Sequence, residues 1–298
     1  MEKMLLSGLR NPLLVIAAIA FFLDSNVLSA DLRECGRAIV IDPFNREFNL
    51  MSLDVYEMYM RSIIYSLERA GYAVDYYKDE NVTIDLLKRL DDEGYDIVYI
   101  NSHGFIDSRG LFALFVREKL NSENALLYQD DIAENLIGYL KEGDLAGYLY
   151  VTPGFFLRYG NDSRLPGTII FVDACYSGNN TSLADVFLVL GASCFIGWDK
   201  VVNVIHGIMM DGLFFHETCK YNRTVEEALR KTRRDPESGA SLVYFGDGSL
   251  RIQRVTLREE SEGFPFNIVG VIIALIISAS IIYVIIQRLK RRYTGKIT

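Results

Sequence analysis

Short apolar runs alternate with longer amphipathic segments along the middle of the chain. Five runs have the length and the apolar character of buried strands: 37–42, 72–77, 95–100, 168–175 and 193–198. Segment 51–71 is typical of what lies between them, because Tyr56, Met60, Ile63 and Leu67 recur on one helical face. The alternation predicts an α/β fold with a mostly parallel central sheet, right-handed crossovers and helices on both faces.

Further elements follow from the same patterns. Helices are expected over five further ranges: 83–94, 129–143, 182–191, 202–219 and 224–234. An extra strand is expected at 111–120 and a final one within 240–252. Within 147–160, a strand turns into a helix at Thr152-Pro153, since proline suits the first turn of a helix.

The two ends of the chain have a different pattern. Residues 1–30 have a basic start, a twelve-residue apolar core and small residues at the end, which is typical of a cleaved secretory signal. Residues 268–286 form a nineteen-residue stretch without a charge, about 28 Å long as a helix, and the basic tail 288–298 follows. The positive-inside rule keeps such a tail in the cytoplasm.

These ends predict four parts: a signal peptide at 1–30, an extracytoplasmic domain at 31–262, a transmembrane helix at 263–287 and a cytoplasmic tail at 288–298. We therefore expect a single-pass protein of the plasma membrane or of a secretory-pathway membrane, held in the lipid bilayer through residues 268–286. The oligomeric state cannot be read from these patterns.

Charge narrows the class of partner. The chain carries −8 overall, and because residues 264–298 hold five bases and no acid while 1–30 is balanced, the domain between them carries −13. An acidic domain argues against a nucleic-acid partner, since phosphates require a basic surface.

Cysteine and asparagine content fits an oxidising compartment. The four cysteines are Cys35, Cys175, Cys194 and Cys219. If Cys175 stays reduced, at most one disulfide forms, and Cys194 with Cys219 is the expected pair. Five Asn-x-Ser/Thr sites are compatible with a glycoprotein: Asn81, Asn161, Asn179, Asn180 and Asn222.

Two of the predicted strands end in residues that carry chemistry. The strand at 95–100 leads into Asn101-Ser102-His103-Gly104, and "TIIFVDACYSG" leads an apolar strand into Asp173 and Cys175. Functional groups in parallel sheets collect beyond the carboxyl ends of the strands. If the two strands are neighbours, His103 and Cys175 lie side by side.

A thiol beside an imidazole is the pairing that a cysteine nucleophile requires, because a base near neutral pKa removes the thiol proton. The Gly104 and Cys175 N–H groups are natural donors for an oxyanion. Each feature alone also suits a packing role, and His206 and His216, in apolar helical sequence, are interpreted as packing residues. No metal site and no cofactor are expected, since the histidines lack partners at ligand spacing.

The two blocks resemble the caspase-like clan of cysteine peptidases, which includes caspases, metacaspases, legumains, gingipains and the glycosylphosphatidylinositol transamidase subunit. The resemblance covers about 37–252, but only the Ser102-His103-Gly104 block and "TIIFVDACYSG" are specific. It implies a caspase-like three-layer α/β sandwich, His103 as the base and Cys175 as the nucleophile.

The chain departs from the clan at two places. The clan usually has a small residue such as glycine where Ser102 stands. The short interval 176–192 leaves no room for the processing loop of caspases, which places the chain nearer the legumain and gingipain branches.

Substrate selection is expected to involve Asp173, two residues before Cys175 and on the same strand face. The clan's equivalent acid contacts the P1 side chain, so Arg or Lys is expected there, or Asn as in legumain-like members. Asp173 could instead cap a nearby loop N–H. Trp198 ends the next strand and suits either a pocket wall or core packing.

The predicted function is therefore that of a membrane-anchored cysteine endopeptidase acting on polypeptides through a His103–Cys175 dyad. Two alternatives stay open: a transamidase or transpeptidase using the same residues, and a non-catalytic surface scaffold on the same fold.

Overall fold

The computed structural model of the chain describes residues 36–52, 54–91, 94–160 and 165–252. The predicted signal at 1–30, the predicted span at 268–286 and Cys35 lie outside the described residues. Within the described part, no helix combines the length and the apolar character that a bilayer crossing needs. Signal, anchor and tail therefore stay predictions.

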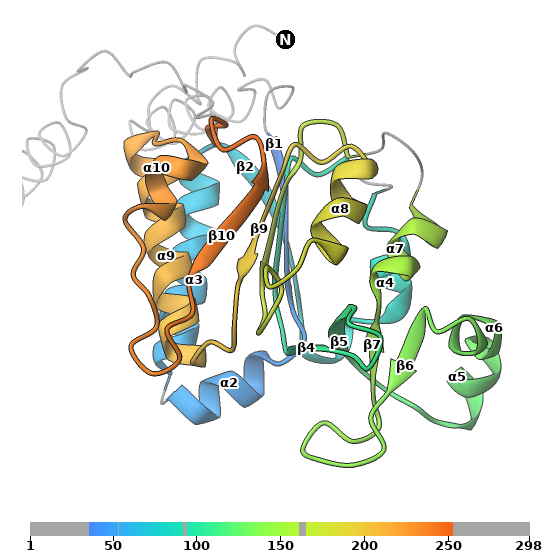
Figure 1. Ribbon diagram of the computed structural model, residues 1–298. Coiled ribbons are helices and arrows are strands. Elements are labelled where there is room, and N and C mark those ends of the chain that lie inside the picture. Colours follow the sequence, from blue (N-terminus) through green and yellow to red (C-terminus); the bar gives the residue numbers. More distant parts are fainter. Residues whose placement is uncertain (1–35, 53, 92–93, 161–164, 253–298) are drawn as a thin grey trace, which may run out of the picture. The chain divides into compact units, whose positions relative to one another are not determined.

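A six-stranded sheet forms the middle of the domain (Figure 1). Its strand order is β10 (Leu242–Gly246), β9 (Cys194–Trp198), β8 (Ile169–Asp173), β3 (Ile97–Asn101), β1 (Gly36–Asp42) and β2 (Tyr72–Lys78). All neighbours pair in parallel except β10, which runs antiparallel to β9. The mostly parallel central sheet predicted from the sequence is confirmed.

Helices cover both faces of this sheet, as the alternation of elements predicts (Figure 1). On one side lie α3 (Val55–Arg69), α9 (Val204–Tyr221) and α10 (Val225–Leu229), and on the other α4 (Ile84–Lys88), α7 (Pro153–Tyr159) and α8 (Ser182–Val189). The side chains of β8 alternate accordingly: Phe171 joins the core under α3 and α9, and Val172 the core on the opposite face. The arrangement fits the three-layer sandwich that the resemblance implied.

A second, antiparallel sheet lies beside the main one and was not expected as a sheet. Its order is β4 (Gly104–Ile106), β5 (Phe112–Lys119), β7 (Tyr148–Val151) and β6 (Ile137–Tyr139). The strand predicted at 111–120 is confirmed as β5, and the passage from strand to helix at Thr152-Pro153 is confirmed at the end of β7.

The helix predicted over 129–143 is wrong. The chain forms α5 (Ser122–Leu127) and α6 (Gln129–Ala133), and then Asn135 takes a left-handed conformation with φ 59° that ends the helical run. Residues 137–139 pair with β7 instead. This pairing requires a glycine at position 138, because a Cβ there would lie only 2.3 Å from the Tyr150 ring.

The disulfide expected between Cys194 and Cys219 is also wrong. Cys194 carries a free thiol at the start of β9. It is fully buried in the apolar core under α3 and α9, so it packs as a small hydrophobic residue.

Helix α2 (Asn45–Ser52) begins just after β1 and is held there by a buried carboxyl group. Asp42 accepts hydrogen bonds from Asn45 Nδ2 at 2.8 Å, Tyr56 Oη at 2.8 Å and Tyr76 Oη at 3.0 Å. The sequence patterns assigned one helix to 51–71, but Asp54, with φ 67°, separates α2 from α3. Asp42 thus fixes how α2 leaves the end of the sheet.

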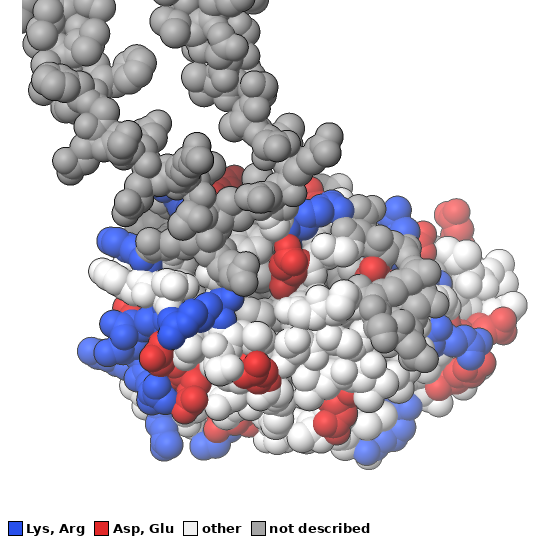
Figure 2. Space-filling model, turned by 90° about the horizontal axis from the view of Figure 1, so that it is seen from above, with Lys and Arg blue, Asp and Glu red and all other residues white. Residues whose placement is uncertain are grey.

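Figure 2 views the molecule onto the edge where β1 begins. Among the side chains that it colours, basic residues are interspersed with acidic ones. The coloured part of this face therefore does not form the uniform basic surface that phosphate binding requires.

Stability should depend on pH through Asp42, because burial raises the pKa of this carboxyl from 3.8 to about 7. In the unfolded chain Asp42 ionises near pH 4, whereas in the folded protein it stays protonated to about pH 7. The contribution of Asp42 to the free energy of unfolding is thus complete below pH 4 and is lost as the pH rises toward 7. The loss is at most about 4 kcal/mol.

The Asp42→Asn variant should lack this dependence. Urea unfolding at pH 4, 5.5 and 7 should show the wild type losing stability relative to the variant as pH rises. The exposed Asp130→Asn serves as control. Parallel pH curves for wild type and Asp42→Asn would contradict this assignment.

Candidate active site

The two segments singled out in the sequence lie at the ends of neighbouring strands. Strands β3 and β8 pair in parallel, with Asn101 opposite Asp173, and the Ser102 N–H extends the ladder by donating to the Asp173 carbonyl at 2.9 Å. His103 and Cys175 each follow two residues after this last register pair. The sequence analysis brings His103 and Cys175 together only if these two strands are neighbours, and they are.

His103 and Cys175 line one cavity at this carboxyl edge of the sheet. The cavity has a volume of about 30 Å³. Its walls are formed by Phe48, Asn101, Ser102, His103, Asp173, Ala174, Cys175, Val202 and Val204. The other lining residues are apolar: Phe48 of α2, Ala174 after β8, and Val202 and Val204 at the start of α9. Charges at this opening are therefore poorly hydrated.

Cys175 sits in a tight turn that requires small residues. The Ser177 N–H donates to the Ala174 carbonyl at 3.1 Å, and Tyr176 takes φ 68°. A Cβ on Gly178 would lie 2.8 Å from the Gly197 carbonyl oxygen. The Ser-Gly pair after the cysteine is thus explained by the close passage of β9.

The thiol of Cys175 is half-buried and has one backbone donor. Its Sγ lies 3.5 Å from the Val202 N and 3.7 Å from the Val202 O. Burial raises the pKa of the Cys175 thiol, the hydrogen bond from Val202 opposes this, and the charge of Asp173 adds to it. At neutral pH the resting group is therefore the thiol, which needs a base to become a nucleophile.

The imidazole of His103 is packed between aromatic rings. Its centroid lies 4.7 Å from the Phe44 ring and 4.9 Å from the Phe48 ring, both edge-on. Burial lowers the pKa of His103, whereas the nearby Glu47 carboxylate raises it. The ring is thus held neutral at pH 7, the state in which it can accept a proton.

Glu47 and Arg117 form a charged pair behind His103. Glu47 Oε1 lies 3.4 Å from His103 Nε2, and Glu47 Oε2 lies 3.5 Å from Arg117 Nη1. The contact with Nε2 is electrostatic, because this nitrogen makes no hydrogen bond among the described residues. The carboxylate stands where it can stabilise an imidazolium.

Gly104 brings an unshielded backbone amide next to Cys175. The Phe115 N–H donates to the His103 carbonyl at 3.1 Å, which makes Gly104 and Leu114 a non-hydrogen-bonded pair and turns the Gly104 N–H away from β5. A Cβ on Gly104 would lie 2.9 Å from the Cys175 carbonyl oxygen. Only glycine allows this approach.

The two residues expected to select the substrate differ in their positions. Asp173 lines the cavity, but it is only 5% exposed and its Oδ2 accepts a hydrogen bond from Asn101 Nδ2 at 2.5 Å. Trp198 is fully buried with Val202 and is not among the residues that line the cavity. Its position is that of a core residue.

Sequence reasoning missed Glu47, Arg117 and the aromatic cradle of His103. The signal was present in Phe44 and Phe48, which recur at helical spacing around an acidic residue just after the first strand. The sequence patterns assign no element to residues 43–50, between the strand at 37–42 and the helix at 51–71, so the faces of this segment were not considered.

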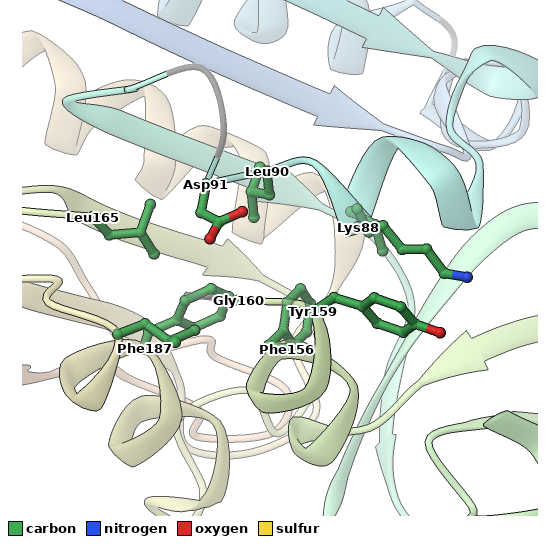
Figure 3. Close-up of a pocket in the computed structure, with 10 residues that line it drawn as sticks. Lys88, Leu90, Asp91, Phe156, Tyr159, Gly160, Leu165 and Phe187 are labelled. Atoms are coloured by element: carbon green, nitrogen blue, oxygen red, sulfur yellow. The ribbon is translucent and has the colours of Figure 1, made fainter. Parts of the chain in front are cut away.

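A second hollow lies between α4, α7 and α8 (Figure 3) and holds no comparable chemistry. Leu90 and Asp91 face Phe156, Phe187 and Leu165 across it. Lys88 and Tyr159 turn their polar ends outward, where both contact the Asp131 carboxylate. Among the described residues, no group of three or more His, Cys, Asp or Glu side chains is placed to hold a metal ion.

Comparison with known proteins finds similarity at the level of structure and not of sequence. No protein-family model matches the chain. No curated protein sequence matches it either. It is similar to the crystal structure of the Arg-specific cysteine proteinase gingipain R, with a TM-score of 0.45 and 14% identity. The match covers 75% of this chain and 49% of that one, so the chain spans about half the length of that structure. A likeness of this size does not establish the activity of the chain.

The charges around His103 predict opposite effects of two substitutions on its titration. Because the Glu47 carboxylate raises the pKa of His103 and Arg117 lowers it, Glu47→Gln should move the imidazole titration to lower pH and Arg117→Met to higher pH. NMR titration of the His103 ring protons in the wild type and in both variants measures the two shifts. Shifts in the same direction would contradict the arrangement.

Proposed function

We propose that the chain is a cysteine peptidase in which Cys175 is the nucleophile and His103 the base. The observation that carries the proposal is that the two side chains follow neighbouring strands and line one cavity. A packing role does not call for a thiol and an imidazole at the same opening, since apolar side chains fill such positions at lower desolvation cost.

The proposed reaction is acyl transfer. His103 takes the thiol proton through Nδ1, the ring nitrogen not turned to Glu47, while Sγ forms a bond to the peptide carbonyl carbon. The imidazolium then gives its proton to the leaving amine as the C–N bond breaks. Water hydrolyses the thioester and restores the thiol.

Three neighbours support these steps. The Gly104 and Cys175 N–H groups would hold the oxyanion, and the outward turn of the Gly104 amide supports this role. Glu47 would stabilise the imidazolium and Arg117 would hold Glu47 in place. The oxyanion and the imidazolium that they stabilise exist only during turnover.

For the substrate, we propose a polypeptide with a basic P1 residue, or Asn, beside Asp173. Its place on the cavity wall supports this role, and the hydrogen bond from Asn101 orients its carboxylate. Complete burial of Trp198 favours core packing over a pocket wall.

We also propose that the domain is extracytoplasmic and that residues 268–286 anchor it to a membrane. Gly246 pairs with Cys194 at the beginning of β9, so the chain leaves β10 at the edge where β1 begins, opposite to the cavity. Gly36, where β1 begins, and Gly246, where β10 ends, thus lie at the edge of the sheet opposite to the proposed site. Protease added to intact cells should digest the domain; its complete protection would contradict this topology.

Removal of either member of the dyad should abolish or severely reduce turnover. Cys175→Ala should be inactive because no other residue supplies the covalent intermediate, and His103→Ala should lose at least ~10²-fold in kcat/KM. The control is Cys194→Ala, which removes a buried thiol away from the cavity. Hydrolysis of a peptide library measures the effect, and an active Cys175→Ala would contradict the proposal. With an added amine, transfer products in place of acid would identify a transamidase.

Substitution of Asp173 should change P1 selectivity. A charge-assisted hydrogen bond to Arg or Lys is worth about 1.5–3 kcal/mol, so Asp173→Asn should lower cleavage after basic residues by about ten- to a hundredfold. Cleavage after Asn should fall less, since an amide pairs with an amide. A wild-type preference for Asp at P1, or an equal loss for every P1 residue, would contradict a role in reading the substrate.

A further inference from the structure

A network of buried polar side chains lies directly beneath the cavity, between β3, β8 and α9. Its members are Tyr99, Asn101, Asp173 and Asp211, and each is at most 5% exposed. Tyr99 Oη donates to Asp211 Oδ2 at 2.7 Å, and Asn101 Nδ2 donates to Asp173 Oδ2 at 2.5 Å. Asp211 was not singled out in the sequence and has no part in the dyad.

Helix α9 closes over this network at a glycine. A Cβ on Gly207 would lie 3.1 Å from Asp173 Oδ1, so the helix passes as near to the carboxylate as a glycine allows. Asp211 follows one turn later on the same helix, and its carboxyl group interacts with that of Asp173. Two carboxyl groups therefore meet in a closed space.

Two adjacent carboxylates cannot both stay ionised in such a space. No cation pairs with Asp173 or Asp211 in the ion pairs of the described residues, apart from the distant influence of His206. Asp211 Oδ1 has no conventional donor among those residues, although it is fully buried. An acceptor without a donor, beside a second carboxylate, is explained if the oxygen carries a proton.

Burial acts on both carboxyl groups of this pair. It raises the pKa of Asp211 well above its ordinary value, and the charge of Asp173 raises it further. The pKa of Asp173 is also raised by burial, but the interactions with Asp211 and Trp198 oppose that effect. Asp173 Oδ2 accepts a hydrogen bond from Asn101, whereas Asp211 Oδ1 has no donor among the described residues, so this geometry favours the proton on Asp211 and the charge on Asp173.

We propose that Asp211 is a specificity-determining positioning residue: its protonated carboxyl donates a hydrogen bond to Asp173 and keeps that side chain an oriented anion for a basic substrate side chain. The inference rests on the proposed function, since it concerns the substrate of the same cavity. The amide of Asn101 and the protonated carboxyl of Asp211 orient the Asp173 carboxylate, and neither removes its negative charge. A guanidinium or ammonium group is the complement of such a charge.

The test compares two substitutions of Asp211 on two peptides that differ only at P1, Arg or its neutral isostere citrulline. The wild type should prefer Arg by about ten- to a hundredfold in kcat/KM. Asp211→Asn keeps a donor and should retain this ratio within about threefold, since the donor and not a charge is what Asp211 supplies. Asp211→Leu removes the donor, so Asp173 takes up the proton and the ratio should fall toward one.

Two outcomes of the peptide test overturn the inference. If Asp211→Asn lowers the ratio of kcat/KM for the Arg peptide to that for the citrulline peptide as much as Asp211→Leu does, Asp211 acts through its charge. If Asp211→Leu retains the ratio, the donor has no role.

A second measurement needs neither substrate turnover nor the leucine variant. The pH dependence of Cys175 alkylation by iodoacetamide reports the charges beside the thiol. The titratable groups nearby are Tyr99, His103, Asp173, His206, Asp211 and Asp235. Asp173→Asn, the positive control, removes a charge and should move the alkylation midpoint to lower pH. Asp211→Asn should leave the midpoint unchanged, and a shift equal to that of the control would overturn the inference.

The two measurements also separate this inference from the proposed function. A wild type that alkylates normally but hydrolyses no peptide would refute the peptidase. The alkylation midpoints would still decide whether Asp211 holds the proton.

Discussion

The parallel pairing of β3 with β8 is the constraint on which the proposed site depends. Because Asn101 stands opposite Asp173, the residues that follow the two strands leave the sheet at the same level. A shift of the register by one residue would turn every side chain of β8 to the other face and separate the thiol from the imidazole. The core on both faces of the sheet, with Phe171 on one side and Val172 on the other, opposes such a shift.

Desolvation at this edge moves the ionisable groups toward their neutral forms. It raises the pKa of the Cys175 thiol, lowers that of the His103 imidazole and raises those of Asp173 and Asp211. A thiol and a neutral imidazole are the resting pair of a general-base mechanism, in which the ion pair forms only as the substrate is attacked. Glu47, which faces the imidazole at 3.4 Å, offsets part of the cost of that ion pair.

The central sheet and the two chemical segments could be predicted from the sequence because each depends on a local pattern. An apolar strand followed by Asn101-Ser102-His103-Gly104, or by Asp173 and Cys175, is visible without any long-range information. The second sheet could not be predicted, since β5 pairs with β7 past α5, α6 and β6, so its strand order depends on contacts between segments distant in the sequence. The helix expected at 129–143 failed because the left-handed Asn135 and the fit of Gly138 against Tyr150 are set by tertiary contacts.

The residues that tune the site were invisible for the same reason. Glu47 reaches His103 through the direction in which α2 leaves β1, which the buried Asp42 fixes. Asp211 meets Asp173 only because α9 crosses the end of β8 at Gly207. Sequence patterns identify groups that carry chemistry at strand ends, but not the partners that the packing of helices brings to them.

The most direct measurement of the central claim is the site of covalent modification by a peptidyl acyloxymethyl ketone ending in Arg, mapped by mass spectrometry on the folded protein. An activated thiol in a substrate cavity predicts a single adduct on Cys175, its near loss in His103→Ala, and no adduct on the buried Cys194. Modification of Cys194 in preference to Cys175, or a rate at Cys175 that is the same with and without His103, would contradict the account.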